Sequence, residues 1–247
     1  MTELQQVRLI AIDCDGVLID DTYLAVIERF ITERGGDYDD ETERSIIGLR
    51  DVVVADLMAR ACGLDQPVEA TLADIWAERE LHLREHPIAV TPGASALLAS
   101  LRDLGARVVC YGGRTREHTF DTYLGGLADF LDSDLPYIGI NEHRPGVDHI
   151  VRDVIGCEFG QAVFVDDVSR VAQAARARGA GFIGFPSSAA HHRQRRFMTD
   201  LGVRHIVDSL AQITPELLTR VDAELATMTH WRETATAFHE PSDASPG

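Results

Sequence analysis

The chain has 247 residues, of which 45% are hydrophobic, so it is long enough to bury a packed core. Its formal net charge of −17 opposes binding to nucleic acid or to anionic membranes, and no apolar run approaches the ~20 residues that cross a bilayer. Without a secretory signal, and without CxxC spacing among the four cysteines, we expect a cytoplasmic protein with neither a zinc site nor a disulfide framework.

The first predicted element is a buried strand over residues 7–12 that ends in two carboxylates. Asp13 and Asp15 lie two residues apart and are followed by Gly16, so in an extended backbone both would point the same way while Cys14 points back. Such close carboxylates repel unless a cation or a shared proton lies between them, and Mg²⁺ suits oxygen ligands of this kind. An Asx-type turn that closes the strand would explain the same residues without chemistry.

Helical periodicity without any strand signal follows the first strand. The spacing of apolar residues predicts helices over residues 22–34, 40–47, 51–61 and 69–86. We therefore expect residues 20–88 to form an all-helical insertion. Within it, Trp76 is expected in the apolar core, together with Leu72, Ile75 and Leu83.

The rest of the chain alternates strands and helices. A helix after Gly93 is followed by predicted strands at 107–111, 137–140, 162–165 and 181–185, with helices between them, and by a last strand–helix unit at 205–225. This alternation predicts an α/β fold, a Rossmann-like open parallel sheet whose ligand lies at the carboxyl ends of the strands. We expect residues 1–19 and 89–228 to form this core and residues 229–247 to be a disordered tail.

A second acidic strand end follows residues 162–165. Phe164-Val165-Asp166-Asp167 leads into an alanine-rich helix and Gly179. Taken with Asp13-Cys14-Asp15-Gly16-Val17, it resembles the closing and opening motifs of the haloacid dehalogenase-like superfamily of aspartate-nucleophile phosphohydrolases. The resemblance covers about residues 7 to 212 and implies that the insertion is the helical cap of that family, with a common cap turn at Ile46–Arg50. All 23 basic residues are arginines, which excludes the branch that cleaves phosphonates with a lysine Schiff base.

The resemblance also implies a mechanism. Asp13 would attack phosphorus and form an aspartyl-phosphate, and Asp15 would protonate the leaving oxygen and later activate water. Mg²⁺ would be held by Asp13, the backbone carbonyl of Asp15, and Asp166 or Asp167. Because Asp166 and Asp167 are adjacent, we expect one to bind the metal directly and the other through water, without a choice between them.

Two motifs depart from the family pattern. Gly112 stands where the family has Ser or Thr, so backbone N–H groups of Gly112 and Gly113 would have to cradle the phosphate. Arg144 stands where the family has lysine. In the cap turn, Arg50 is a candidate for binding a second anionic group of the substrate. The arginines near His191, namely Arg193, Arg195 and Arg196, are expected on a solvated helix face.

These observations predict a Mg²⁺-dependent phosphatase that acts on a small phosphorylated metabolite. A phosphosugar mutase similar to β-phosphoglucomutase would use the same aspartates and the same cap. A degenerate member that binds a phosphorylated ligand or a partner protein without turnover is the third alternative. The acids at positions 13, 15, 166 and 167 argue against degeneration. No oligomeric state follows from the sequence.

Overall fold

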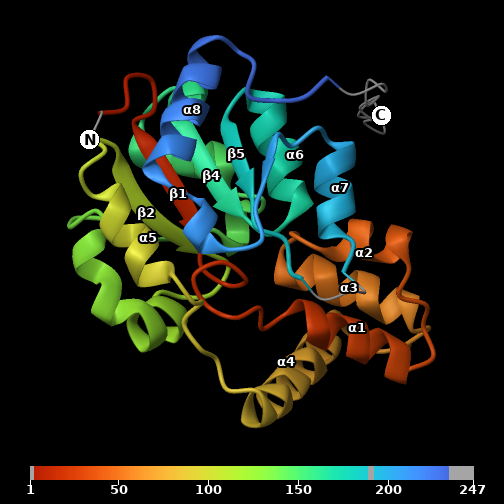
Figure 1. Cartoon of the computed structure of the whole chain (residues 1–247). Helices are drawn as coiled ribbons and strands as arrows, with labels where there is room; N and C mark the ends of the chain where they lie inside the picture. The colour runs from red at the N-terminus through yellow and green to blue at the C-terminus, as the bar shows by residue number, and fades with distance from the viewer. Residues whose placement is uncertain (1–2, 189–191, 234–247) are drawn as a thin grey trace.

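A computed structural model describes residues 3–188 and 192–233. Within these residues, six strands form one parallel sheet in the order β3-β2-β1-β4-β5-β6 (Figure 1). The strands are β1 (Leu9–Asp13), β2 (Arg107–Gly112), β3 (Tyr137–Gly139), β4 (Ala162–Asp166), β5 (Gly181–Gly184) and β6 (His205–Ile206). The open parallel α/β architecture predicted from the sequence is confirmed.

Helices α1 to α5 lie between β1 and β2 in the chain, as the sequence predicts. The α-helices are α1 (Leu24–Glu33), α2 (Asp40–Ile46), α3 (Asp51–Ala61), α4 (Val68–Glu85), α5 (Ala94–Leu101), α6 (Ser169–Arg178), α7 (Gln194–Asp200) and α8 (Pro215–Ala226). Shorter helical segments are η1 (Glu117–Leu124), η2 (Gly125–Phe130), η3 (Asn141–His143), η4 (His149–Ile155), η5 (Phe159–Gln161) and η6 (Leu210–Gln212). Two of the predicted helices, η1 and η4, are π-helical rather than α-helical. Among the described residues, no helix is long and apolar enough to cross a membrane.

The sheet is buried on both faces, which explains the unbroken apolar run of β1. Ile10 and Ile12 pack into one apolar cluster, which also contains Leu97 and Leu98 of α5, whereas Leu9 packs into a second cluster. Alternate residues of a strand point to opposite faces, so both faces need apolar side chains. Helices α1 to α4 have an apolar cluster of their own. They form the cap, which lies beyond the ends toward which the strand arrows point (Figure 1).

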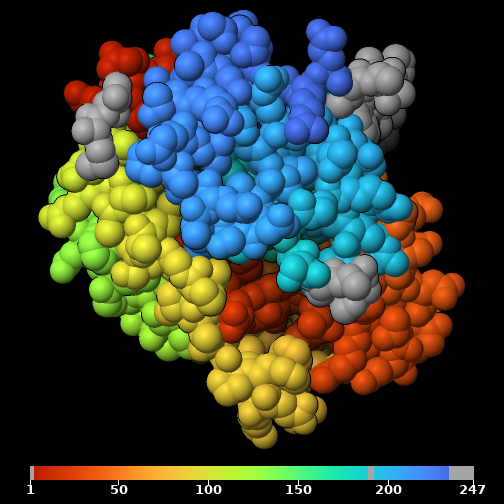
Figure 2. Space-filling model, in the orientation of Figure 1, coloured from red at the N-terminus to blue at the C-terminus, as the bar shows by residue number. Residues whose placement is uncertain are grey.

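The cap is joined to the core first through its two linkers. Ile19 pairs with Val90 in an antiparallel bridge, the N–H of Asp20 donates to the carbonyl of Ala89 at 3.0 Å, and the N–H of Ala89 donates to the Asp20 carboxylate at 2.9 Å. The entering and leaving segments are therefore held side by side. In Figure 2, the gold atoms of α4 and the orange atoms of α2 and α3 lie below the cyan and blue atoms of the core, with red atoms of the N-terminal part of the chain between them.

A second attachment of the cap is centred on Glu43 of α2, whose side chain is fully buried. Its carboxylate accepts hydrogen bonds from the backbone and guanidinium of Arg193, at 3.1 and 3.2 Å, and from the Gln194 amide at 2.7 Å. Arg196 pairs with Asp40 at the start of α2. The prediction of a solvated helix face is therefore wrong for Arg193, whose side chain is only 25% exposed because the acidic end of α2 lies against it. The side chains of Arg195 and Arg196 are exposed, as predicted. His191 lies outside the described residues.

Residues 230 and 231, which the sequence analysis places in a disordered tail, contact the core. The indole N–H of Trp231 donates to the carbonyl of Ala180 at 3.1 Å, and the indole ring stacks on Phe182. His230 is 7% exposed. His230 and Trp231 therefore pack on the core, because a tryptophan near a sheet edge buries a large apolar area. Residues 234–247 lie outside the described residues.

Candidate active site

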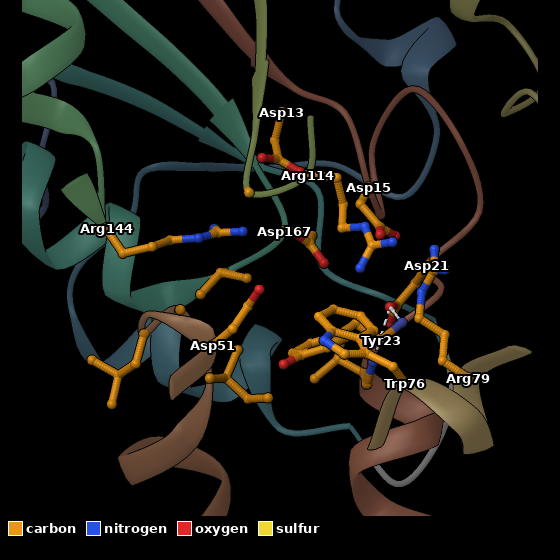
Figure 3. Close-up of a pocket in the computed structure, with 16 residues that line it drawn as sticks. Asp13, Asp15, Asp21, Tyr23, Asp51, Trp76, Arg79, Arg114, Arg144 and Asp167 are labelled. Atoms are coloured by element: carbon orange, nitrogen blue, oxygen red, sulfur yellow. Dashed lines mark hydrogen bonds between the residues drawn. The ribbon is translucent and has the colours of Figure 1, made fainter. Parts of the chain in front are cut away.

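The carboxyl ends of β1 and β4 bring the predicted acids to one place, as Figure 3 shows for Asp13 and Asp167. Asp13 ends β1 and is 5% exposed. Its Oδ1 has no hydrogen-bond partner among the described residues. Burial raises the pKa of Asp13 well above its usual range, and the charges of Asp166 and Asp167 raise this pKa further. Asp13 therefore presents an unengaged oxygen to the pocket.

The carboxylate of Asp15 is held in a fixed orientation. It accepts hydrogen bonds from the backbone N–H of Thr22 at 2.8 Å and from the Thr22 hydroxyl at 2.6 Å. Arg79 of α4 in turn donates to the Thr22 hydroxyl oxygen, at 2.7 Å from its Nη2. Burial and the nearby charge of Asp21 raise the pKa of Asp15 to about 6. A carboxyl group with this pKa can exchange protons near neutral pH, as a general acid and base must.

The structure separates the two adjacent acids at the end of β4. Asp166 accepts hydrogen bonds from the Tyr111 hydroxyl and from the backbone N–H of Val168, so its oxygens are engaged away from the pocket. Asp167 lines the pocket instead. A Cβ on Gly16, whose φ is +93°, would lie 2.4 Å from the Asp167 carboxylate, so only glycine lets the turn approach this acid.

The acids suit a hard divalent cation. Burial raises the pKa values of both Asp13 and Asp167, and the charges of neighbouring acids, Asp166 in both cases, raise them further. A cation beside these carboxylates would relieve the repulsion. In the described part of the chain, no three His, Cys, Asp or Glu side chains are arranged to hold a metal ion. Mg²⁺ commonly takes only one or two carboxylates and keeps several waters. The residues present fit such a site, in which Asp13, Asp167 and the Asp15 carbonyl would be the protein ligands.

The turn after β2 lies against Arg144. A Cβ on Gly113 would lie 2.4 Å from a guanidinium nitrogen of Arg144, so the missing side chain is what admits the arginine. A Cβ on Gly112 would lie 2.9 Å from the hydroxyl of Tyr137, which donates to the carbonyl of Arg114 at 2.6 Å. Burial lowers the pKa of Arg144, but the charges of Asp13 and other acids outweigh it and the net shift is upward. Tyr137 and Arg144 thus occupy the space that side chains at positions 112 and 113 would need.

Between these residues and the cap lies a pocket of about 680 Å³, part of which is open to solvent. The core supplies Asp13, Asp15, Gly113, Arg114, Arg144, Asp167 and Val168, and the cap and its linker supply Asp21, Tyr23, Leu24, Ile47, Gly48, Leu49, Asp51, Trp76 and Arg79. The pocket thus mixes carboxylates with arginines and has an aromatic wall.

Two sequence expectations about the cap need correction. Trp76 lies at the pocket rather than in the cap core, with the Arg114 guanidinium 4.1 Å from the centre of its ring. Arg50 does not line the pocket, because it pairs with Glu142 of the core. Two further pocket residues, Arg79 and Arg114, are not predicted by the sequence analysis. The position of Arg114 directly after the glycines that end β2 could have identified it. The periodicity of the helix that contains Arg79 does not show which of its faces meets the pocket.

The comparisons with known proteins bear on the fold. No protein-family model and no curated protein sequence matches the chain. Solved structures match it over most of its length. A conserved haloacid dehalogenase-like protein of unknown function from Agrobacterium tumefaciens is 20% identical, with 87% of this chain and 98% of that one covered and a TM-score of 0.63.

Two further structures carry more specific descriptions. A haloacid dehalogenase family hydrolase from Deinococcus radiodurans, solved with bound phosphate and sodium, is 19% identical, with 87% and 97% of the two chains covered and a TM-score of 0.56. A β-phosphoglucomutase from Clostridium difficile is 13% identical, with 90% and 99% covered and a TM-score of 0.64. The chain therefore has the fold of the capped haloacid dehalogenase-like hydrolases.

Proposed function

We propose that the protein is a Mg²⁺-dependent phosphatase that hydrolyses a small phosphorylated metabolite through an aspartyl-phosphate. The observation that carries this proposal is the arrangement around Asp13. Its unengaged carboxylate oxygen lies in a pocket beside Arg144 and Asp167, and Asp15 nearby has a pKa of about 6. The phosphate bound to the Deinococcus radiodurans hydrolase agrees with a phosphoryl ligand in this fold.

The reaction proceeds in two displacements. An oxygen of Asp13 attacks phosphorus, the bond from phosphorus to the ester oxygen breaks, and Asp15 gives that oxygen its proton. Asp15, now ionised, takes a proton from a water that attacks the aspartyl-phosphate, so that phosphate leaves and Asp13 is restored. Arg144 and the backbone of the Gly112–Gly113 turn bind the phosphoryl oxygens. A bound Mg²⁺ supplies positive charge that lets the anionic groups approach one another.

A phosphosugar mutase is the second candidate. It is favoured by the additional arginines of the pocket, Arg79 and Arg114, and by the similarity of the fold to a β-phosphoglucomutase. A mutase would return the phosphoryl group to another hydroxyl of the same sugar instead of releasing it to water. The two activities are distinguished by whether inorganic phosphate or an isomeric sugar phosphate accumulates.

The experiment measures phosphate release from p-nitrophenyl phosphate and from a panel of phosphorylated metabolites, with Mg²⁺ and with EDTA. Asp13→Asn should abolish turnover without unfolding the protein, because the amide keeps the shape but is a poor nucleophile. Asp15→Asn should let aspartyl-phosphate form from p-nitrophenyl phosphate, whose leaving group needs little protonation, and should slow its hydrolysis. Asp103→Asn is the matched control, because Asp103 lies on the exposed surface of the core domain. Turnover by Asp13→Asn near the wild-type rate would refute the covalent mechanism.

A further inference from the structure

The pocket has a second cationic wall that the proposed chemistry at Asp13 does not use. Figure 3 shows Arg144 on one side of Asp167 and Arg114 with Arg79 on the other. Arg114 belongs to the core, at the turn after β2, whereas Arg79 belongs to helix α4 of the cap. Core and cap therefore each contribute one guanidinium to the same wall.

Arg79 is buried with hydrogen-bonding capacity left over. Its side chain is 3% exposed. Its Nε and Nη2 donate to the Thr22 hydroxyl oxygen at 3.2 and 2.7 Å. Its Nη1 has no hydrogen-bond partner among the described residues and lies 3.8 Å from the carboxylate of Glu80. A buried charged donor without an acceptor is costly, so this N–H group is suited to an anion that enters the pocket.

The two guanidiniums also act on each other. Burial lowers the pKa of Arg114, and the charge of Arg79 lowers it further. Asp51 and Asp15 oppose this effect, but Asp15 is already engaged by Thr22. Trp76 lies beside both arginines, at 4.1 Å from the Arg114 guanidinium and 6.0 Å from that of Arg79. Two positively charged guanidiniums therefore lie beside the same aromatic ring, and one bound anion would relieve the repulsion between them.

We propose that Arg79 and Arg114 form a subsite for a second anionic group of the substrate. The inference rests on the proposed phosphatase or mutase activity and names its substrate class. The substrate is a small molecule that carries a carboxylate or a second phosphoryl group in addition to the phosphoryl group that Asp13 attacks. This assigns to Arg79 and Arg114 the role that the sequence suggested for Arg50, which is engaged by Glu142.

The test compares esters that differ only in the second anion. Alkyl phosphates of increasing chain length are matched with phosphorylated hydroxy acids and with diol bisphosphates of the same length, and kcat/KM is measured for each. At one length or more, the dianionic ester should exceed its alkyl match by roughly tenfold or more, because hydrogen bonds between charged groups are the stronger ones. The hydroxy acids and the bisphosphates distinguish a carboxylate from a phosphoryl group as the second anion.

Variants assign the preference to the subsite. Arg114→Gln should reduce the ratio of the two kcat/KM values roughly tenfold or more, and Arg114→Lys should restore part of it. Arg116→Gln is the matched control, since Arg116 lies outside the pocket and pairs with Asp121 at 3.1 Å. The inference is overturned if no dianionic ester is preferred at any length, or if Arg114→Gln leaves the ratio unchanged.

Failure of the proposed function gives a different result. In that case wild-type protein hydrolyses none of the alkyl phosphates, none of the dianionic esters and no p-nitrophenyl phosphate. Calorimetric titration of the same esters into wild-type protein then tests the subsite by itself. Tighter binding of a dianionic ester than of its alkyl match, lost in Arg114→Gln and kept in Arg116→Gln, supports the subsite without turnover, and equal binding overturns it.

Discussion

Substitution of Gly112 by serine would restore the hydroxyl that the family pattern places at the end of β2, and we expect it to damage the protein. The new Cβ would lie 2.9 Å from the Tyr137 hydroxyl and 3.4 Å from Cβ of Cys14. Because Tyr137 is 6% exposed, its ring has little room to retreat. Overpacking of this kind costs about 1–3 kcal/mol, and loss of the 2.6 Å hydrogen bond from Tyr137 to the Arg114 carbonyl adds about 1 kcal/mol.

The expected loss for Gly112→Ser is therefore about 2–4 kcal/mol in the free energy of unfolding, measured by urea denaturation. The rate should fall as well, roughly tenfold in kcat/KM, because the displaced turn carries Gly113 and Arg114 at the pocket. Gly139→Ser is the matched control, since Gly139 is the register partner of Gly112 on β3 and a Cβ there meets nothing within 4 Å.

A double-mutant cycle with Tyr137→Phe tests the stated cause. Tyr137→Phe removes the hydroxyl that a side chain at position 112 would meet, so the double variant should lose less stability than the two single losses added together. If Gly112→Ser is as stable as the wild type, or hydrolyses p-nitrophenyl phosphate faster, then the glycine is a defect rather than an adaptation and our reasoning is wrong.

Two further predictions concern the acids. Asp167→Ala should raise the Mg²⁺ concentration needed for half-maximal activity far more than Asp166→Ala, because Asp166 is engaged by Tyr111; equal shifts in a Mg²⁺ titration would contradict this assignment. Burial raises the pKa values of Asp13 and Asp167, and it raises those of Asp15 and Asp166 to about 6. An aspartate in the unfolded chain loses its proton at a pKa of about 4, so between about pH 4 and 6 the metal-free folded protein holds protons that the unfolded chain has released. The free energy of unfolding in EDTA should therefore fall as pH rises from about 4 through 6, and Mg²⁺ should reduce the fall; urea denaturation showing a rise across this window would refute the argument.

Local patterns were sufficient to predict the sheet and the acidic strand ends. An apolar run that stops at Asp13, and another that stops at Asp166, identify buried parallel strands, and parallel strands bring their carboxyl ends to one edge. Gly16 marked the turn that follows Asp13 and Asp15. Each of these signals lies within a few residues of the chain, where the geometry of a single strand decides which way a side chain points.

Contacts between distant segments could not be predicted in this way. The periodicity of α4 shows that Ile75 is buried, but it does not reveal that the neighbouring Trp76 and Arg79 meet the core at the pocket. The choice between Asp166 and Asp167 depends on Tyr111, which belongs to another strand. Trp231 likewise packs against a distant segment, since its indole N–H donates to the carbonyl of Ala180, 51 residues earlier.

The attachment at Glu43 has a consequence for how often the cap is free to move. Three hydrogen bonds reach this carboxylate, and at about 1–1.5 kcal/mol each they contribute roughly 3–4 kcal/mol. A free energy of that size would by itself leave this one contact broken in about one molecule in several hundred. Release of the cap also requires Arg170 of the core to leave the carbonyls of Arg44 and Ile47, and Arg50 to leave Glu142. Movement of the cap away from the core is therefore limited by several contacts that must break together.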